Sequence, residues 1–361
     1  MARLSVHRAE SRIKTLAHPG SVTVPSAGRV AVLLLLLSIL VPIAVPAAEA
    51  GAQNITLKLA ANVPANSLWD IGLKRMAAEF ARASGGRVKI FIPPTTRTAS
   101  DSDIIRDMKL DVDGALLNTY GLAYLYPDSL ALSMPGLIGS DKEFDAVLAA
   151  VSPLIKSKLE DRYVVLALAK GGWVRFFSRS PIVYPSDLGK MRISLEPENG
   201  KEIQFMQSFD ARVVTGSTAD FLLQVNSNAV DAIYLSPIFT AALWSQLRGK
   251  IAYMSSFKVA PFLGAIVFTK ASWERVPAEL RPQLERIVLD ISTQMSLDGA
   301  KIEEEAIKSL DGIRIPPEPA DAAADWAKEM AQRRNGMLTQ MFSIDFLEKM
   351  DEALANARRA K

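Results

Sequence analysis

The alternation of short apolar strands with amphipathic helices is the feature that most constrains the fold of this chain. In a first series the pattern predicts strands at 55–60, 87–92 and 113–117, separated by helices at 67–84 and 101–110. In a second series it predicts strands at 190–194, 212–214 and 230–235, with helices at 200–209 and 218–225. A strand–helix–strand order makes the strands parallel and places the helices on the faces of the sheet. The sequence therefore predicts an α/β protein that contains two such units.

Longer apolar segments are expected to connect the two units. Residues 163–169 form an uninterrupted apolar run, typical of a buried parallel strand, and an aromatic strand follows at 173–178. A further buried strand at 262–269 returns toward the first series. The remainder is predicted to be helical at 271–310 and 320–360, and Glu303–Glu305 are expected to lie on a solvated helix face.

These elements predict two domains joined by a hinge. Residues 51–171 together with 261–300 are expected to form one domain and 172–260 the other. The long C-terminal helices of residues 301–361 are expected to pack across both. In such architectures ligands bind in the cleft, at strand ends and helix N-termini.

The first 50 residues are predicted to be a cleavable secretory signal peptide. Basic residues precede an uncharged run that contains Leu33–Leu37, and Ala48-Glu49-Ala50 provides a small-residue cleavage site. The run is barely long enough to span a bilayer, so an uncleaved anchor is the weaker alternative. Because the chain has no cysteine for a lipid anchor, we expect a protein free in the periplasm.

The remaining 311 residues lack two residue types that much of enzyme chemistry needs. The chain has no cysteine, and its two histidines, His7 and His18, lie in the predicted signal. This excludes cysteine nucleophiles, Ser-His-Asp triads and Cys/His zinc sites. Apart from residues 1–50 the chain holds 37 basic and 37 acidic residues, which does not indicate a nucleic-acid binder. We expect no enzyme activity, no cofactor and no metal.

Several segments, in order, resemble one known family. They are GGRVKIFIPP at 85–94, MKLDVDGALL at 108–117, SMPGLI at 133–138, SDLGKMRI at 186–193 and FLLQVNSNAVDAIYLSP at 221–237. The chain resembles the DctP-type extracytoplasmic solute-binding proteins of TRAP (tripartite ATP-independent periplasmic) transporters over about residues 55–315.

The resemblance implies a two-domain, type II-like periplasmic binding-protein fold with a hinged cleft. It implies capture of a small organic molecule, a carboxylate in particular, and delivery to TRAP permease subunits in the membrane. We expect a monomer, and a dimer formed through the long C-terminal helices stays open. Two other functions stay open. One is a ligand sensor that signals to a membrane receptor, and the other is a secreted hydrolase that needs neither histidine nor cysteine.

The resemblance also directs attention to two arginines. In the family, an arginine at the end of a "KIR" motif clamps the ligand carboxylate, but here Arg192 falls on the lysine of that motif and Ser194 on the arginine. An upstream family arginine falls on Val174, one residue before Arg175. A displacement of one residue along a strand turns a side chain to the other face of the sheet. Either a local shift of register therefore lets Arg175 and Arg192 hold the ligand carboxylate, or this protein lacks the clamp.

If the clamp is lost, the pocket is expected to depend on Trp173, Tyr120 and Tyr234. Trp69 and Asn118 are cleft candidates whether or not the clamp is present. Trp173 lies on the central strand, Tyr234 ends the strand at 230–235, and Trp69 begins the first long helix. Asn118 and Tyr120 follow the third strand and are expected to face the cleft. For each of these side chains ordinary packing is the competing interpretation.

Overall fold

We describe the protein from a computed structural model. The structure describes residues 54–63, 65, 67–94, 100–195, 200–216 and 220–359, all of which belong to one unit, Ala52–Lys361. The predicted signal peptide lies outside the described residues. Within the described ranges, none of the helices is both long and apolar enough to cross a membrane.

The first series forms one end of the sheet. Strand β1 (Ile55–Ala61) lies between β2 (Val88–Phe91) and β3 (Gly114–Asn118), and both pairings are parallel. Helix α1 (Leu68–Ala83) connects β1 to β2, and α2 (Asp101–Asp107) precedes β3. The Ser67 hydroxyl accepts a hydrogen bond from the Asp70 amide and caps α1, as the sequence predicts.

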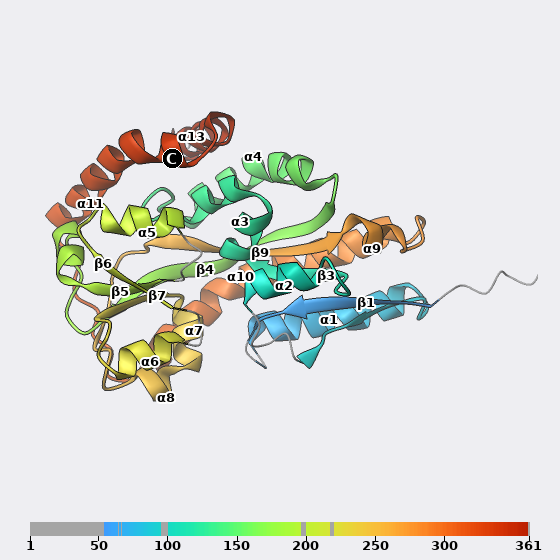
Figure 1. Cartoon of the computed structure of the whole chain (residues 1–361), viewed down its shortest axis with the longest axis horizontal. Coiled ribbons are helices and arrows are strands. Elements are labelled where there is room, and N and C mark those ends of the chain that lie inside the picture. Colours follow the sequence, from blue (N-terminus) through green and yellow to red (C-terminus); the bar gives the residue numbers. More distant parts are fainter. Residues whose placement is uncertain are drawn as a thin grey trace, which may run out of the picture. The chain divides into compact units, whose positions relative to one another are not determined.

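Two long strands cross the middle of the molecule (Figure 1). Strand β9 (Ala260–Thr269) is antiparallel both to β3 and to β4 (Tyr163–Ser178). The sequence predicted a buried strand at 163–169 and a second strand at 173–178. Both segments are strand, but the expected parallel pairing and the separation into two strands are wrong. β4 is one strand of 16 residues whose register shifts between Lys170 and Trp173. Its apolar character comes from burial on both faces, which antiparallel partners allow equally well.

The second series forms the other end of the sheet. β7 (Ala232–Leu235) is antiparallel to β4, and β5 (Arg192–Leu195) is parallel both to β7 and to β6 (Arg212–Thr215). The strand order is β2-β1-β3-β9-β4-β7-β5-β6, and the short β8 (Tyr253–Met254) also pairs with β4. The helices α5 (Gly200–Gln207) and α6 (Asp220–Asn226) belong to this end.

The remaining helices cover the sheet (Figure 1). Helix α10 (Arg281–Ser309) packs against β4 and α1, and α13 (Ile344–Arg359) packs against α4. The single helix predicted at 271–310 is two helices, because the segment around Pro277 separates α9 from α10. The others are α3 (Thr119–Leu125), α4 (Asp141–Leu159), α7 (Pro237–Ala242), α8 (Trp244–Leu247), α9 (Lys270–Glu274), α11 (Ala320–Arg333) and α12 (Thr339–Met341).

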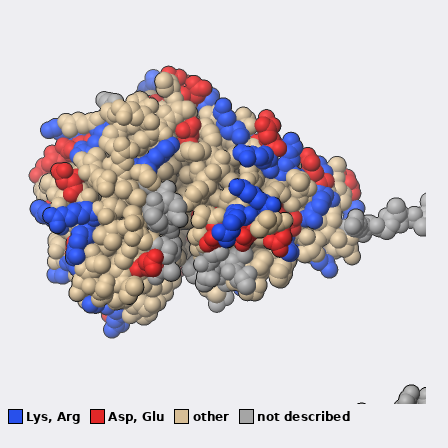
Figure 2. All heavy atoms as spheres, in the orientation of Figure 1, with Lys and Arg blue, Asp and Glu red and all other residues tan. Residues whose placement is uncertain are grey.

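The buried apolar side chains form three clusters. One lies between α1, α10 and the β1 end of the sheet, one lies beneath α6 and α8, and the largest extends along β4 and β9 toward α4 and α13. On the face drawn in Figure 2, acidic and basic side chains are interspersed, without a broad patch of one sign. The domain boundaries expected from the sequence stay a prediction.

Candidate ligand pocket

A cavity of about 200 Å³ lies where strands from both ends of the sheet stop. The carboxyl ends of β3 and β7, the residues after β1, and the N-terminal residues of α1, α2 and α7 contribute to its wall. The described lining residues are Asn62, Val63, Ser67, Trp69, Asp101, Leu116, Leu117, Asn118, Tyr120, Val174, Tyr234, Leu235, Ser236, Ile238, Phe239, Ala242, Phe262 and Gly264. Strand ends at such a position are the usual ligand site of α/β folds.

Local capping fixes the polar rim of the cavity. The Asn118 side-chain oxygen accepts hydrogen bonds from the amides of Tyr120 (2.7 Å) and Gly121 (3.0 Å) and so begins α3. The Ser236 hydroxyl caps α7 in the same way, through the Phe239 amide. Because capping uses the Asn118 oxygen, its amide nitrogen remains as a hydrogen-bond donor.

Two glycines in the sheet let Trp69 lie against the backbone. A Cβ atom on Gly264 would come within 3.2 Å of the indole, and one on Gly171 within 2.9 Å. The same Gly171 Cβ would also collide with the ring of Phe262. The indole is therefore held flat at the base of the cavity because β4 and β9 have no side chain at these points.

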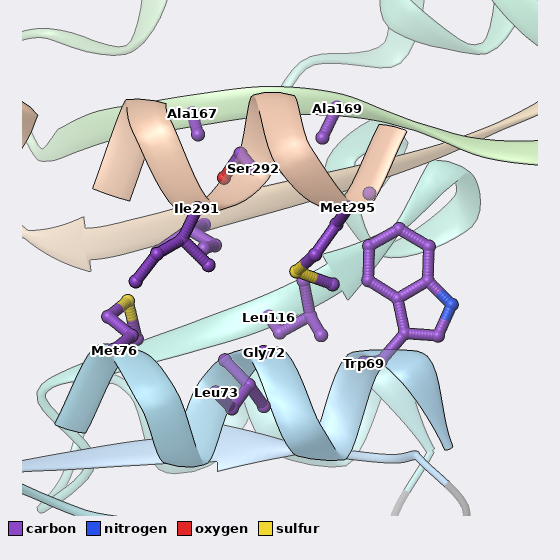
Figure 3. A pocket seen from close by; sticks show the side chains of 12 residues that line it. Trp69, Gly72, Leu73, Met76, Leu116, Ala167, Ala169, Ile291, Ser292 and Met295 are labelled. Atoms are coloured by element: carbon purple, nitrogen blue, oxygen red, sulfur yellow. The ribbon is translucent and has the colours of Figure 1, made fainter. Parts of the chain in front are cut away.

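Trp69 also borders a small gap between α1 and α10 (Figure 3). That gap measures about 10 Å³, and its wall is apolar, with the thioethers of Met76 and Met295, apart from Ser292. It is about the smallest space that holds one water, so it is a packing defect and not a ligand site. Gly72 allows the close helix contact here, because a Cβ would collide with Met295.

Tyr234 lines the cavity, and its hydroxyl is buried out of contact with solvent. Its side chain is 8% exposed and its ring packs 5.5 Å from that of Phe176. The hydroxyl has no hydrogen-bond partner among the described residues. Burial raises the pKa of Tyr234 well above its usual value, and the nearby Glu202 carboxylate acts in the same direction. The phenol therefore stays protonated and can donate a hydrogen bond.

Of the eight side chains proposed from the sequence, the structure brings four together at this cavity: Trp69, Asn118, Tyr120 and Tyr234. The other four lie elsewhere. The Arg192 guanidinium binds both carboxylate oxygens of Asp231, at 2.8 and 2.7 Å, and this arginine lowers the pKa of Asp231. The Ser194 hydroxyl lies 2.6 Å from the side-chain oxygen of Gln224.

Arg175 lies on the opposite face of β4 from the cavity. Val174 lines the cavity, and the alternation along the strand then turns Arg175 toward a second hollow, bordered by Lys258 and Trp326. The arginine Nη1 donates to the carbonyls of Ser255 (3.2 Å) and Ser256 (2.5 Å). In this arrangement Arg175 does not reach a ligand in the cavity.

Glu303 of α10 is the acidic neighbour of Arg175. Its Oε1 lies 4.0 Å from Arg175 Nε, and its Oε2 accepts the Trp173 amide at 2.9 Å. Trp173 is buried here, and its indole nitrogen donates to Asp141. The predicted solvated position of Glu303 is therefore wrong, because this turn of α10 packs on β4 while Glu304 and Glu305 face outward.

Desolvation by burial has the largest effect on the pKa values of both Glu303 and Arg175. It raises the pKa of Glu303, and the Trp173 amide and the Arg175 charge act against that rise. The guanidinium stays charged, since its intrinsic pKa is far above neutrality. Gly172 makes the contact possible, because it has φ +98° and a Cβ there would lie 2.7 Å from the Glu303 carboxylate.

Sequence analysis missed the apolar wall that α7 and β9 supply. Ile238, Phe239 and Phe262 line the cavity, yet each lies in an apolar segment typical of ordinary core. The one local signal was Ser236-Pro237 after a strand, which marks a helix start at the strand end. The described residues contain no cluster of three or more acidic, histidine or cysteine side chains that could hold a metal ion.

A cavity at strand ends, with apolar walls and a few hydrogen-bonding groups, is the site of a protein that binds a small molecule. Residues 59–339 match the family model for bacterial extracellular solute-binding proteins, family 7, and the chain belongs to that family. No curated protein matches the sequence.

Solved structures share the fold. A TRAP periplasmic solute-binding protein from Ralstonia eutropha H16, with bound (S)-2-acetolactate, is 19% identical with a TM-score of 0.75. The match covers 83% of this chain and 99% of that one. A second, from Sulfurospirillum deleyianum with bound succinate, is 15% identical (TM-score 0.73, coverage 83% and 99%). A sugar acid binding protein from Advenella mimigardefordensis, in complex with galactonate, is 13% identical (TM-score 0.76, coverage 84% and 99%). The predicted fold class, a two-domain periplasmic binding protein, is confirmed.

Proposed function

We propose that the protein captures a small organic molecule in the cavity and delivers it to the membrane permease of a TRAP transporter. The observation that carries this proposal is the origin of the cavity wall. Asn118 and Trp69 come from the β1–β3 end of the sheet, whereas Tyr234 and Phe239 come from the β5–β7 end. A ligand held there contacts both ends at once and stabilises the state in which they are closed around it.

The membership of a solute-binding family supports a binding role without catalysis. Export through the N-terminal signal would place the protein in the periplasm, where a monomer meets the permease subunits. Organic acids are the first ligands to test, since the solved relatives from three bacteria hold acetolactate, succinate and galactonate.

A thermal-shift screen of the exported chain with small organic acids and their neutral analogues tests this proposal. At a ligand concentration one hundred times its Kd, binding stabilises the folded state by about 2.7 kcal/mol. We expect at least one compound to raise the Tm because it binds the folded state. The affinity of that compound is then measured by calorimetry.

A variant that fills the cavity provides the matched control. Ile238→Trp places a large ring in the cavity wall and is expected to abolish binding, whereas Leu223→Trp changes a side chain that is 69% exposed on α6. Equal binding by both variants, or a screen without any stabilising compound, would contradict the proposed site.

A further inference from the structure

We infer that the cavity selects a ligand with a flat apolar body and one oxygen acceptor group, such as an aromatic monoacid or its neutral carbonyl analogue. This inference rests on the proposed function and specifies the chemical class of its ligand. It depends on three properties of the described wall: its hydrocarbon surface, its charges and its one unpartnered buried donor.

Most of the described wall is aliphatic or aromatic. Five of the lining residues carry rings, and they surround a cavity of about 200 Å³: Trp69, Tyr120, Tyr234, Phe239 and Phe262. Aromatic rings contact other flat rings favourably at centroid separations of about 4.5–7 Å. A polyhydroxylated ligand would instead bring more hydroxyl groups than the few polar side chains of this wall can pair, and each unpaired group costs about 1–3 kcal/mol. The wall therefore favours a flat apolar body over a sugar acid.

The charges of the described wall disfavour a ligand with two carboxylates. No lysine or arginine is among the lining residues that the structure describes, and the one charged side chain there is acidic, Asp101. The two arginines that the sequence suggested are engaged elsewhere, Arg175 with backbone carbonyls and Arg192 with Asp231. Burying a charge without a partner is expensive, so a second acid group on the ligand would weaken binding.

Tyr234 supplies the donor for the single oxygen group. Its hydroxyl is buried, protonated and without a partner among the described residues, whereas buried tyrosine hydroxyls usually have one. This hydroxyl is closed to solvent, so a ligand oxygen would satisfy it only after the wall of the cavity rearranges around the ligand. The Asn118 amide nitrogen, at the β3 side of the same cavity, is a second neutral donor. Neutral donors can donate a hydrogen bond either to a carboxylate oxygen or to a carbonyl oxygen, so the wall selects for an oxygen acceptor and not for its charge.

Calorimetric titration of the exported chain with two matched sets of compounds tests the inference. The first set is benzoate, benzamide, phenylacetate and phenylacetamide, and the second is succinate and galacturonate. We expect a member of the first set to bind at least about tenfold more tightly than either member of the second. Binding of the acids alone identifies a carboxylate ligand, and binding of the amides as well identifies a neutral carbonyl; both support the inference.

Tyr234→Phe removes only the hydroxyl and should weaken the bound compound about two- to tenfold. Tyr184→Phe, at a half-buried tyrosine outside the cavity wall whose hydroxyl donates to Asp321, is the control and should leave affinity unchanged. Without ligand, Tyr234→Phe should be at least as stable as the parent, because an unpaired buried hydroxyl is lost.

The possible failures are distinguishable. If succinate or galacturonate binds and none of the aromatic compounds does, the inference is overturned while the proposed function stands. If aromatic compounds bind equally well to Tyr234→Phe, the hydroxyl is not the donor and the inference fails in that part. If none of these compounds and none in the wider screen binds, both the inference and the proposed function fail.

Discussion

Removal of the Glu303 side chain is expected to destabilise the protein strongly, although it lies outside the cavity. Glu303 on α10 is 7% exposed and carries two contacts, the charge of Arg175 at 4.0 Å and the amide of Trp173 at 2.9 Å. Glu303→Ala leaves a buried guanidinium with only the carbonyls of Ser255 and Ser256, and leaves one buried amide without its acceptor.

The expected loss follows from those two contacts. Breaking a buried ion pair by deleting one partner costs about 3–5 kcal/mol, and the 4.0 Å separation without a direct hydrogen bond places this pair near the lower limit. Loss of a charged acceptor for the Trp173 amide adds about 1.5 kcal/mol. Because one carboxylate makes both contacts the two losses overlap, and we expect Glu303→Ala to lower the free energy of unfolding by about 3–4 kcal/mol.

Urea denaturation of the exported chain measures the change. Glu304→Ala is the matched control, since this neighbour pairs with Lys308 on the exposed side of α10 and should cost less than about 0.5 kcal/mol. Glu303→Gln keeps an acceptor for the Trp173 amide and should lose roughly half as much as Glu303→Ala. If Glu303→Ala is no more destabilising than Glu304→Ala, the buried contact does not contribute to stability and our argument is refuted.

Three further predictions concern the cavity and the arginines. Gly171→Ala should push Trp69 out of place and weaken ligand binding about tenfold. The control Gly299→Ala, with open space around its Cβ, should not change the affinity. Equal calorimetric affinities for the two variants would refute this prediction. Arg175→Ala should lower stability and leave affinity within about twofold, and a tenfold loss of affinity would mean that Arg175 reaches the ligand after all. The hydrogen bonds from Arg192 lower the pKa of Asp231 in the folded state. The ionised Asp231 therefore stabilises the fold fully above its unfolded pKa of about 3.9, and this stabilisation is lost as the pH falls through the folded pKa. Asp231→Asn should therefore destabilise the protein at pH 7 but little at pH 2, which urea denaturation at both values will check.

Local rules were sufficient to predict most of the individual elements. A serine cap, apolar residues at helical spacing and two terminal glycines predict α1 almost to the residue. The parallel order within each end of the sheet follows from the strand–helix–strand pattern. Asn118 and Tyr234 could be placed at the cavity because both lie at the carboxyl ends of strands that meet there. Each of these predictions rests on contacts between residues close in the sequence or on a general rule of topology.

Other features were decided by the tertiary structure. The register shift between Lys170 and Trp173 determines which face of β4 carries Val174 and which carries Arg175, and nothing local in the sequence fixes that shift. Glu303 looks like its two solvated neighbours until α10 packs on β4 beside Gly172. These outcomes depend on contacts between residues that are 88 to 130 positions apart in the sequence. The periodicity of a sequence shows which side chains share a face, but only the packed chain shows what that face meets.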